Sequence, residues 1–232
     1  MPDLAARLAD VRDRIARAAD RARRDPSRIR LVSVSKTFGT ALVRAVALAG
    51  QIDFGENKVQ EAQRKRLETA DLPLRWHLIG HLQSNKATKA AALFDVIHSI
   101  DDAALVRKID AAAAAAGRSL ELLVQVDLAG EATKHGAREA ELLAIFEAGR
   151  ECTAVRLSGL MTLPPATGNP EDARPWFREL NRCRDRLLAA GIEPGHLAEL
   201  SMGMSHDYEI AIEEGSTIVR VGTAIFGIRQ LG

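Results

Sequence analysis

The sequence has few cysteines, few aromatic residues, no long apolar run and no marked excess of one charge. Cys152 and Cys183 are the two cysteines, and aromatic residues make up 4% of the 232 residues. Two distant cysteines indicate neither a disulfide framework nor a zinc site. No segment approaches the roughly 18 uninterrupted apolar residues of a membrane helix, and Asp3 and Arg7 lie where a signal peptide would need its apolar core. We therefore expect a cytoplasmic protein that does not bind a membrane.

The formal net charge of +1 gives no general attraction to nucleic acid. The chain between Arg7 and Arg30 is rich in arginine, but aspartates are interleaved with these residues. A nucleic-acid-binding protein concentrates its basic residues on one face or in one tail. The pattern indicates instead a solvated helix with charges of both signs, and we expect no nucleic-acid partner.

Hydrophobic residues make up 47% of the chain, and many of them form short β-rich runs that alternate with longer helical patterns. The strand-like segments are residues 31–35, 52–55, 76–80, 95–100, 120–128, 156–163, 196–202 and 216–222. Helical periodicity covers residues 2–24 at the start of the chain and, between strands, 58–69, 102–117, 137–150 and 172–190. A repeated strand and crossover helix predicts a parallel sheet. Eight repeats in this length predict an α/β fold, a (β/α)8 TIM barrel with an extra N-terminal helix.

An open, doubly wound sheet is the competing architecture. It usually carries a glycine-rich turn after its first strand, whereas residues 35–39 here contain a lysine in place of a glycine pair. No linker rich in proline, glycine or serine divides the chain, and residues 164–170 read as one long loop after the sixth strand. We therefore favour the barrel and expect residues 1–232 to form a single domain.

The carboxyl ends of the strands build the active face of such a barrel. Lys36 directly follows the first strand, where partial burial would lower its pKa and free the amine to attack a carbonyl group. The alternative is a lysine that merely opens a solvated loop.

Two segments after the seventh and eighth strands have the composition of a phosphate site. Residues 201–205 read Ser-Met-Gly-Met-Ser, and residues 221–224 read Val-Gly-Thr-Ala. Glycines allow backbone N–H groups to approach an anion, and hydroxyl groups add donors. These two loops frequently bind phosphate in this fold. Alternatively, Gly203 and Gly222 simply relieve crowding at the strand ends.

Arg220 lies two residues before Gly222 and on the same side of that strand. A guanidinium group that points into the barrel needs a partner, and Glu199 or Asp127 could provide a salt bridge. Together with Lys36 and the phosphate loops, Arg220 indicates a phosphorylated carbonyl compound held as a Schiff base. Pyridoxal 5'-phosphate fits this description, and so does the substrate of a sugar-phosphate aldolase.

Several motifs closely resemble those of the pyridoxal phosphate homeostasis proteins, which are single-domain relatives of the alanine racemase N-terminal barrel. The resemblance extends from about residue 5 to residue 227, in the same order and spacing. The motifs lie at residues 34–37, 54–57, 76–86, 158–161, 200–205 and 215–227.

The resemblance implies a pyridoxal phosphate site at named positions. Lys36 would form the Schiff base with the cofactor. The phosphate would bind to Ser201, Gly222 and Thr223 and to the backbone around Gly203 and Met204.

Further positions would surround the cofactor ring. Arg220 would face the pyridine nitrogen, Asn57 would lie near the ring or its phenolic oxygen, and His77 and Met204 would be neighbours of the ring. Alternatively, Asn57 caps the helix that begins at 58, and His77 is a hydrogen-bonded core histidine. We expect no metal site from His77 and His81, because no carboxylate or cysteine shares their motif.

An arginine that faces the pyridine nitrogen is no acid at physiological pH, so the ring withdraws electrons poorly. The related racemases also use a tyrosine from a second domain, for which this chain has no room, and its only tyrosine, Tyr208, is expected to pack in a helix. We therefore expect a monomeric protein of vitamin B6 and amino-acid homeostasis with little or no catalysis. Its partners would be pyridoxal phosphate and either amino acids or apo-enzymes that use this cofactor. A racemase or lyase of low activity is the alternative.

Overall fold

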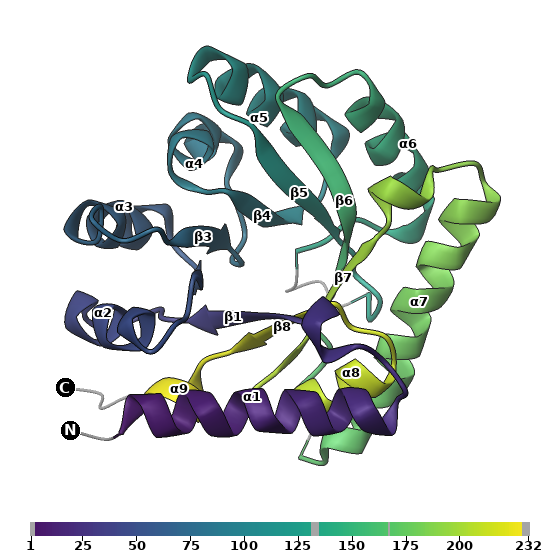
Figure 1. Ribbon diagram of the computed structural model, residues 1–232. Coiled ribbons are helices and arrows are strands. Elements are labelled where there is room, and N and C mark those ends of the chain that lie inside the picture. Colours follow the sequence, from purple (N-terminus) through teal and green to yellow (C-terminus); the bar gives the residue numbers. More distant parts are fainter. Residues whose placement is uncertain (1–2, 131–134, 167, 229–232) are drawn as a thin grey trace.

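A computed structural model describes residues 3–130, 135–166 and 168–228 of the protein. Within these residues, eight parallel strands form a closed barrel in the order in which they occur along the chain, as shown in Figure 1. The strands are β1 (Arg30–Val34), β2 (Asp53–Glu56), β3 (Arg75–Leu78), β4 (Val96–Ile100), β5 (Leu120–Gln125), β6 (Val155–Met161), β7 (Glu199–Met204) and β8 (Ile218–Val221). The predicted TIM barrel is confirmed.

Helices surround the barrel and follow the strands in alternation. They are α1 (Leu4–Arg21), α2 (Thr40–Leu48), α3 (Val59–Glu68), α4 (Ala87–Leu93), α5 (Ala103–Ala115), α6 (Glu139–Arg150), α7 (Arg174–Ala189), α8 (Tyr208–Glu213) and α9 (Thr223–Phe226). Short 3-10 turns lie at η1 (Pro26–Arg28), η2 (Ser84–Lys86), η3 (Pro170–Ala173) and η4 (Pro194–His196). The predicted strand at 196–202 is misplaced, since η4 contains His196 and β7 continues to Met204.

Helix α1 is the predicted extra N-terminal helix. The Asp3 side chain accepts a hydrogen bond from the backbone N–H of Ala6 at 2.9 Å and caps the first turn. Leu4, Leu8 and Val11 recur at helical spacing and are buried. Figure 1 shows α1 along the outside of the barrel, where it packs against α8 and α9.

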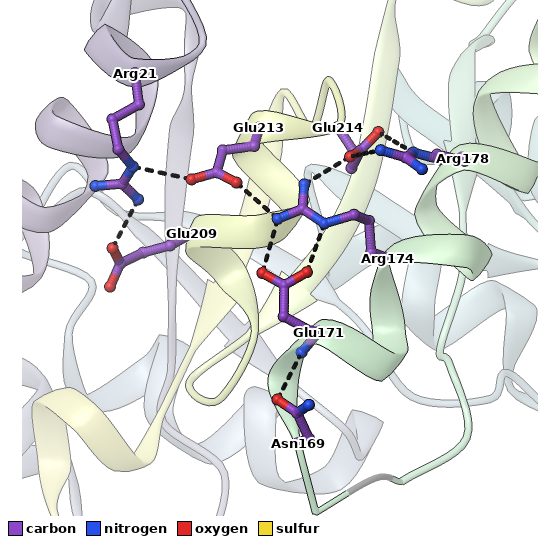
Figure 2. A network of polar contacts seen from close by, with 8 residues as sticks. All are labelled: Arg21, Asn169, Glu171, Arg174, Arg178, Glu209, Glu213 and Glu214. Carbon is purple, nitrogen blue, oxygen red and sulfur yellow. Dashed lines mark hydrogen bonds and ion pairs between the residues drawn. The ribbon is translucent and has the colours of Figure 1, made fainter.

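Arg14 and Arg21 of α1 form ion pairs with glutamates of α8 and not with the interleaved aspartates. Arg21 contacts Glu209 and Glu213 at 3.0 and 2.9 Å, and Figure 2 shows how Arg174 of α7 extends this network to Glu213 and Glu214. Exposed ion pairs contribute at most about 1 kcal/mol each. The network therefore orients three helices more than it stabilises the fold.

The apolar core lies mainly between the strands and the surrounding helices, whereas the barrel interior contains a smaller apolar cluster. That interior cluster consists of Val32, Val96, Leu123, Met161 and Ile218. Several buried residues inside the barrel are polar, and they belong to the site described below. No helix among the described residues has the length and apolar character required to cross a membrane.

Candidate functional site

A cavity of about 290 Å³ opens at the carboxyl end of the barrel strands, close to the size range of small-molecule sites. The predicted site residues that line it are Lys36, Asn57, Met204, Arg220, Gly222 and Thr223. Phe38, Ile79 and Leu163 provide an apolar wall. Ser205 and His206 also line the cavity. Ser205 belongs to the predicted phosphate segment 201–205 without having been assigned a contact of its own, and His206 was not predicted.

Lys36 lies in a tight turn that leaves β1. The backbone N–H of Phe38 donates to the Ser35 carbonyl at 3.0 Å and closes the turn. Between them, Thr37 has a φ of 70°, which is unfavourable for a residue with a branched side chain. Such a conformation persists only where the surroundings enforce it.

A buried ionic network holds this turn on both sides of Lys36. The fully buried Lys65 donates to the Ser35 carbonyl at 2.7 Å, to Glu56 at 2.7 Å and to Glu61 at 2.8 Å. The Ser35 hydroxyl donates to Glu56 at 2.6 Å, and the backbone N–H of Thr37 donates to Glu61 at 2.6 Å. Burial raises the pKa of Glu56, against the lowering effect of Lys65. Lys65 and its carboxylate partners therefore fix the backbone from which Lys36 extends.

Backbone donors meet at the part of the cavity formed after β7 and β8. The Ser205 hydroxyl accepts hydrogen bonds from the backbone N–H groups of Gly222 and Ala224 at 3.1 and 3.4 Å. A side chain at Gly222 would lie 3.1 Å from the Val34 carbonyl, so a larger residue would crowd β1. The two N–H groups, the hydroxyl and the neighbouring Thr223 give this part of the cavity the donors that an oxyanion requires.

Gly203 lies outside this cavity lining and has a packing role. Its φ is 92°, and an added Cβ would lie 2.6 Å from the Ala211 side chain in α8. The pairing of β7 with β8 shifts register between Ser201 and Met204, and this irregularity brings Met204 beside Arg220. The interpretation that Gly203 relieves crowding at the strand end therefore fits its surroundings better than a direct contact with phosphate.

Arg220 extends into the barrel mouth and is 3% exposed. It donates to the Ser201 hydroxyl at 2.6 Å and to the Thr162 carbonyl at 2.9 Å. The expected alternative of a salt bridge to Glu199 is wrong, since Glu199 faces Arg30 at 3.6 Å. Burial lowers the pKa of Arg220 to about 10, while the charge of Asp207 opposes this shift. Arg220 is therefore still a cation at pH 7.

A chain of hydrogen bonds leads from Arg220 through the barrel interior. The Ser201 hydroxyl lies 2.8 Å from Nδ1 of His98, Nε2 of His98 lies 2.9 Å from Nδ1 of His77, and Nε2 of His77 lies 2.8 Å from the Asp53 carboxylate. His77 is thus the hydrogen-bonded core histidine of the alternative interpretation, and the predicted contact with the cofactor ring is not supported. His98 was missed, although a histidine within the apolar segment 96–100 is itself a signal.

One assignment of donors and acceptors satisfies every hydrogen bond of this chain. Burial lowers the pKa of both His77 and His98, so both imidazoles are neutral at pH 7. Because a carboxylate only accepts, His77 donates to Asp53, His98 donates to His77 and Ser201 donates to His98. The Ser201 hydroxyl therefore donates its hydrogen bond to His98 in the barrel interior and not towards the cavity. Ser201 is not part of the cavity lining, whereas Ser205 is.

Two further expectations concern Asn57 and Tyr208. Asn57 lines the cavity and does not cap a helix, since the N-cap of α3 is Lys58 and makes no side-chain capping bond. Tyr208 packs in α8 and is 1% exposed, as predicted. Burial raises the pKa of its phenol to about 12, which makes it a poor base at pH 7.

Comparison with known proteins identifies close relatives over nearly the whole chain. The model of the family described as alanine racemase, N-terminal domain, matches residues 7–230. The pyridoxal phosphate homeostasis proteins of Aquifex aeolicus and Pseudomonas aeruginosa are each 42% identical, over 97% and 100% of this chain and 97% and 98% of their own length. The structure of PipY from Synechococcus elongatus PCC7942, with pyridoxal phosphate bound, has a TM-score of 0.86 and 39% identity, and covers 97% of this chain and 100% of PipY.

Proposed function

This chain belongs to the pyridoxal phosphate homeostasis protein family, and on that premise we propose that it binds pyridoxal 5'-phosphate in the cavity at the barrel mouth. It would thereby serve in vitamin B6 and amino-acid homeostasis. The observation that carries the proposal is that Lys36, Arg220 and the donors around Ser205 line one cavity. A Schiff-base lysine, a cation and a phosphate cradle are the groups that this cofactor requires.

We assign the roles of individual residues from their places in the cavity. Lys36 would hold the cofactor as a Schiff base, while the N–H groups of Gly222 and Ala224, with the hydroxyl groups of Ser205 and Thr223, would bind its phosphate. Asn57 and Met204 would lie beside the ring, and Arg220 would face its nitrogen. The bound cofactor supplies an aldehyde and an electron-withdrawing ring.

The residues around the cavity favour storage or transport of the cofactor over rapid catalysis. A guanidinium group fixed by Ser201 and Thr162 does not release a proton to the ring nitrogen at pH 7, which limits electron withdrawal by the ring. Tyr208, the only tyrosine, is not part of the cavity lining. We therefore propose that the protein carries the cofactor in the cytoplasm, with amino acids or apo-enzymes as partners and as a monomer.

One observation supports a second candidate function. His206 is exposed and lines the cavity, and an imidazole can transfer protons near neutral pH. A racemase or lyase of low activity would use it as a base. Steady-state assays with D- and L-amino acids distinguish the two functions: the carrier gives turnover far below about 1 s⁻¹, which is the lower end of ordinary enzyme rates.

The decisive experiment for the cofactor site is borohydride reduction followed by peptide mass spectrometry. We expect the reduced cofactor on Lys36, and no fixed cofactor in Lys36→Ala. Lys58→Ala is the matched control, because Lys58 is exposed at the start of α3 and outside the cavity lining. Attachment to another lysine in the wild-type protein, or none at all, would overturn the proposal.

A further inference from the structure

Two histidines and one aspartate from different loops meet at the carboxyl end of the barrel. His81 follows β3, Asp101 directly follows β4, and His135 lies in the loop after β5. One potential ligand atom from each of the three lies within 4.8 Å of the others. The motif of residues 76–86 offers no carboxylate to His81, but the fold supplies one from the next strand.

The backbone beside His135 is attached to the end of β5. The Gln125 side-chain amide donates to the His135 carbonyl. The backbone N–H of Ala137 donates to the Gln125 carbonyl at 2.8 Å, and the N–H of Asp127 donates to the Ala137 carbonyl at 3.0 Å. These bonds fix the place from which the His135 imidazole extends, so little ordering is required when it binds a ligand.

The backbones of His81 and Asp101 are fixed as well. Gly80, directly before His81, packs against the backbone of Asn57 with no space for a side chain. Asp102, directly after Asp101, caps α5 by accepting a backbone N–H at 2.7 Å. All three potential ligands thus extend from positions that the barrel holds in place.

The charges of this cluster favour a cation at its centre. The imidazoles of His81 and His135 stack with centroids 3.5 Å apart and an angle of 9°, and Nδ1 of His81 lies 3.5 Å from an Asp101 oxygen. A neutral imidazole offers a nitrogen lone pair that can bind a metal ion. No arginine or lysine of the described residues forms an ion pair with Asp101.

A second group of potential metal ligands differs from the histidine cluster, because a cation of the protein already lies beside it. Glu139, Glu179 and Cys183 also lie within ligand distance of one another. Arg186 already occupies that group: it forms ion pairs with both glutamates and contacts the Cys183 sulfur at 3.2 Å. Burial also raises the pKa of Cys183 to about 11, so its thiolate is disfavoured. A guanidinium group thus provides there the positive charge that the histidine cluster lacks among the described residues.

We propose that His81, Asp101 and His135 bind one divalent first-row transition-metal ion, with Zn²⁺ as the representative. Two imidazoles and a carboxylate suit such ions, while Mg²⁺ and Ca²⁺ prefer oxygen ligands. With metal–ligand bonds of about 2.0–2.2 Å, the three ligand atoms must approach one another to about 3.3 Å. The two exposed imidazoles can do this by side-chain rotation. Three protein ligands leave a coordination position open to water, at the end of the barrel where the cavity opens. The proposal does not depend on the function proposed above.

Calorimetric titration of the chelator-treated full-length protein with Zn²⁺ tests the proposal. We expect one ion per chain, with at least about tenfold weaker binding in His81→Ala, in Asp101→Asn and in His135→Ala, since even groups behind the ligands contribute that much. Titration with Co²⁺ should give the visible absorption of a nitrogen-ligated ion, and it should be absent from the same variants.

Two control variants complete the test. His196→Ala removes a histidine that contacts the Leu157 carbonyl elsewhere in the fold, and Cys183→Ser removes the thiol of the second group. Both should leave the zinc affinity unchanged. The proposal is overturned if the wild-type protein binds no stoichiometric ion, if His81→Ala and His135→Ala retain full affinity, or if Cys183→Ser abolishes binding.

Discussion

Replacement of Lys65 by methionine tests whether the buried ionic network holds the turn that contains Lys36. Methionine keeps most of the length and the apolar stem of lysine but removes the ammonium group. That group makes three contacts, to the Ser35 carbonyl, Glu56 and Glu61, at 2.7 to 2.8 Å. Glu56 is fully buried, and its second carboxylate oxygen has no hydrogen-bond partner. The variant would leave this carboxylate without a cation.

The expected loss in the free energy of unfolding depends on the protonation of Glu56 in the variant. A free glutamate has a pKa of about 4.3, and each pKa unit corresponds to about 1.4 kcal/mol. Protonation of Glu56 at pH 7 therefore costs about 3.7 kcal/mol, and the lost bond to the Ser35 carbonyl adds about 1 kcal/mol. Burial of the methionine offsets part of this cost. We expect Lys65→Met to be about 3–5 kcal/mol less stable than the wild-type protein at pH 7, the range for a broken buried ion pair.

The loss should depend on pH in a defined direction. In the variant, the folded-state pKa of Glu56 lies further above its unfolded value than in the wild-type protein, where Lys65 lowers it. Its contribution to stability is therefore complete below the unfolded pKa and is lost as the pH rises towards the folded pKa. Between pH 7 and pH 5 the difference from the wild-type protein should shrink, by at most about 2.7 kcal/mol. The double variant Lys65→Met/Glu56→Gln has no buried charge in this place and should recover most of the stability at pH 7.

Urea unfolding followed by the fluorescence of the two tryptophans, of which Trp76 is buried, measures these differences. The Lys36 turn provides a second measurement, since cofactor affinity should fall in Lys65→Met and return in part in the double variant. A loss below about 1 kcal/mol would refute the assigned role of the network. A loss that does not change between pH 5 and pH 7 would show that the Glu56 charge is not its cause.

Three other substitutions test further parts of the site. Gly203→Ala should lower the free energy of unfolding by about 2–4 kcal/mol, because its φ is 92° and the added Cβ meets Ala211 at 2.6 Å; an unchanged melting temperature would contradict this. The pKa of His98 is lowered by burial, so its contribution to stability is complete above the unfolded value of about 6.5 and is lost as the pH falls below it. His98→Gln should therefore flatten the decline in stability between pH 7 and pH 5 by up to about 1.4 kcal/mol per pH unit, measured by urea unfolding beside the wild-type protein. Ser205→Ala should weaken pyridoxal phosphate binding about tenfold in a fluorescence titration, while the affinity for pyridoxal, which has no phosphate, should stay the same.

Much of the site could be predicted from short segments of the chain. Lys36 at the end of β1 and the Gly222-Thr223 pair at the end of β8 are positions that a strand followed by a turn determines locally. Arg220 could be assigned to the barrel mouth because side chains alternate along a strand. Ser205 lies within the recognised segment 200–205, but its role depends on the place where β7 ends.

The polar chain inside the barrel could not be predicted in the same way. His77 and His98 are far from Ser201 in the sequence. Only the closure of the barrel brings His77 to 2.9 Å from His98, and His98 to 2.8 Å from Ser201. His77 lies in the polar chain and not in the cavity lining, because the position of an inward-facing residue along its strand decides whether it lies in the barrel interior or at the cavity. Likewise, the register shift that places Gly203 against α8 arises from pairing between β7 and β8.

The sequence by itself determined the alternation of strands and helices, the TIM barrel and the positions that follow each strand, because hydrophobic periodicity and turn chemistry are local properties. The tertiary structure decided which of those positions share a cavity, which cation fixes the Lys36 turn and which carboxylate meets His81. These relations depend on barrel closure and strand register. Both are set by the packing of residues that are distant in the chain, and no local pattern encodes them.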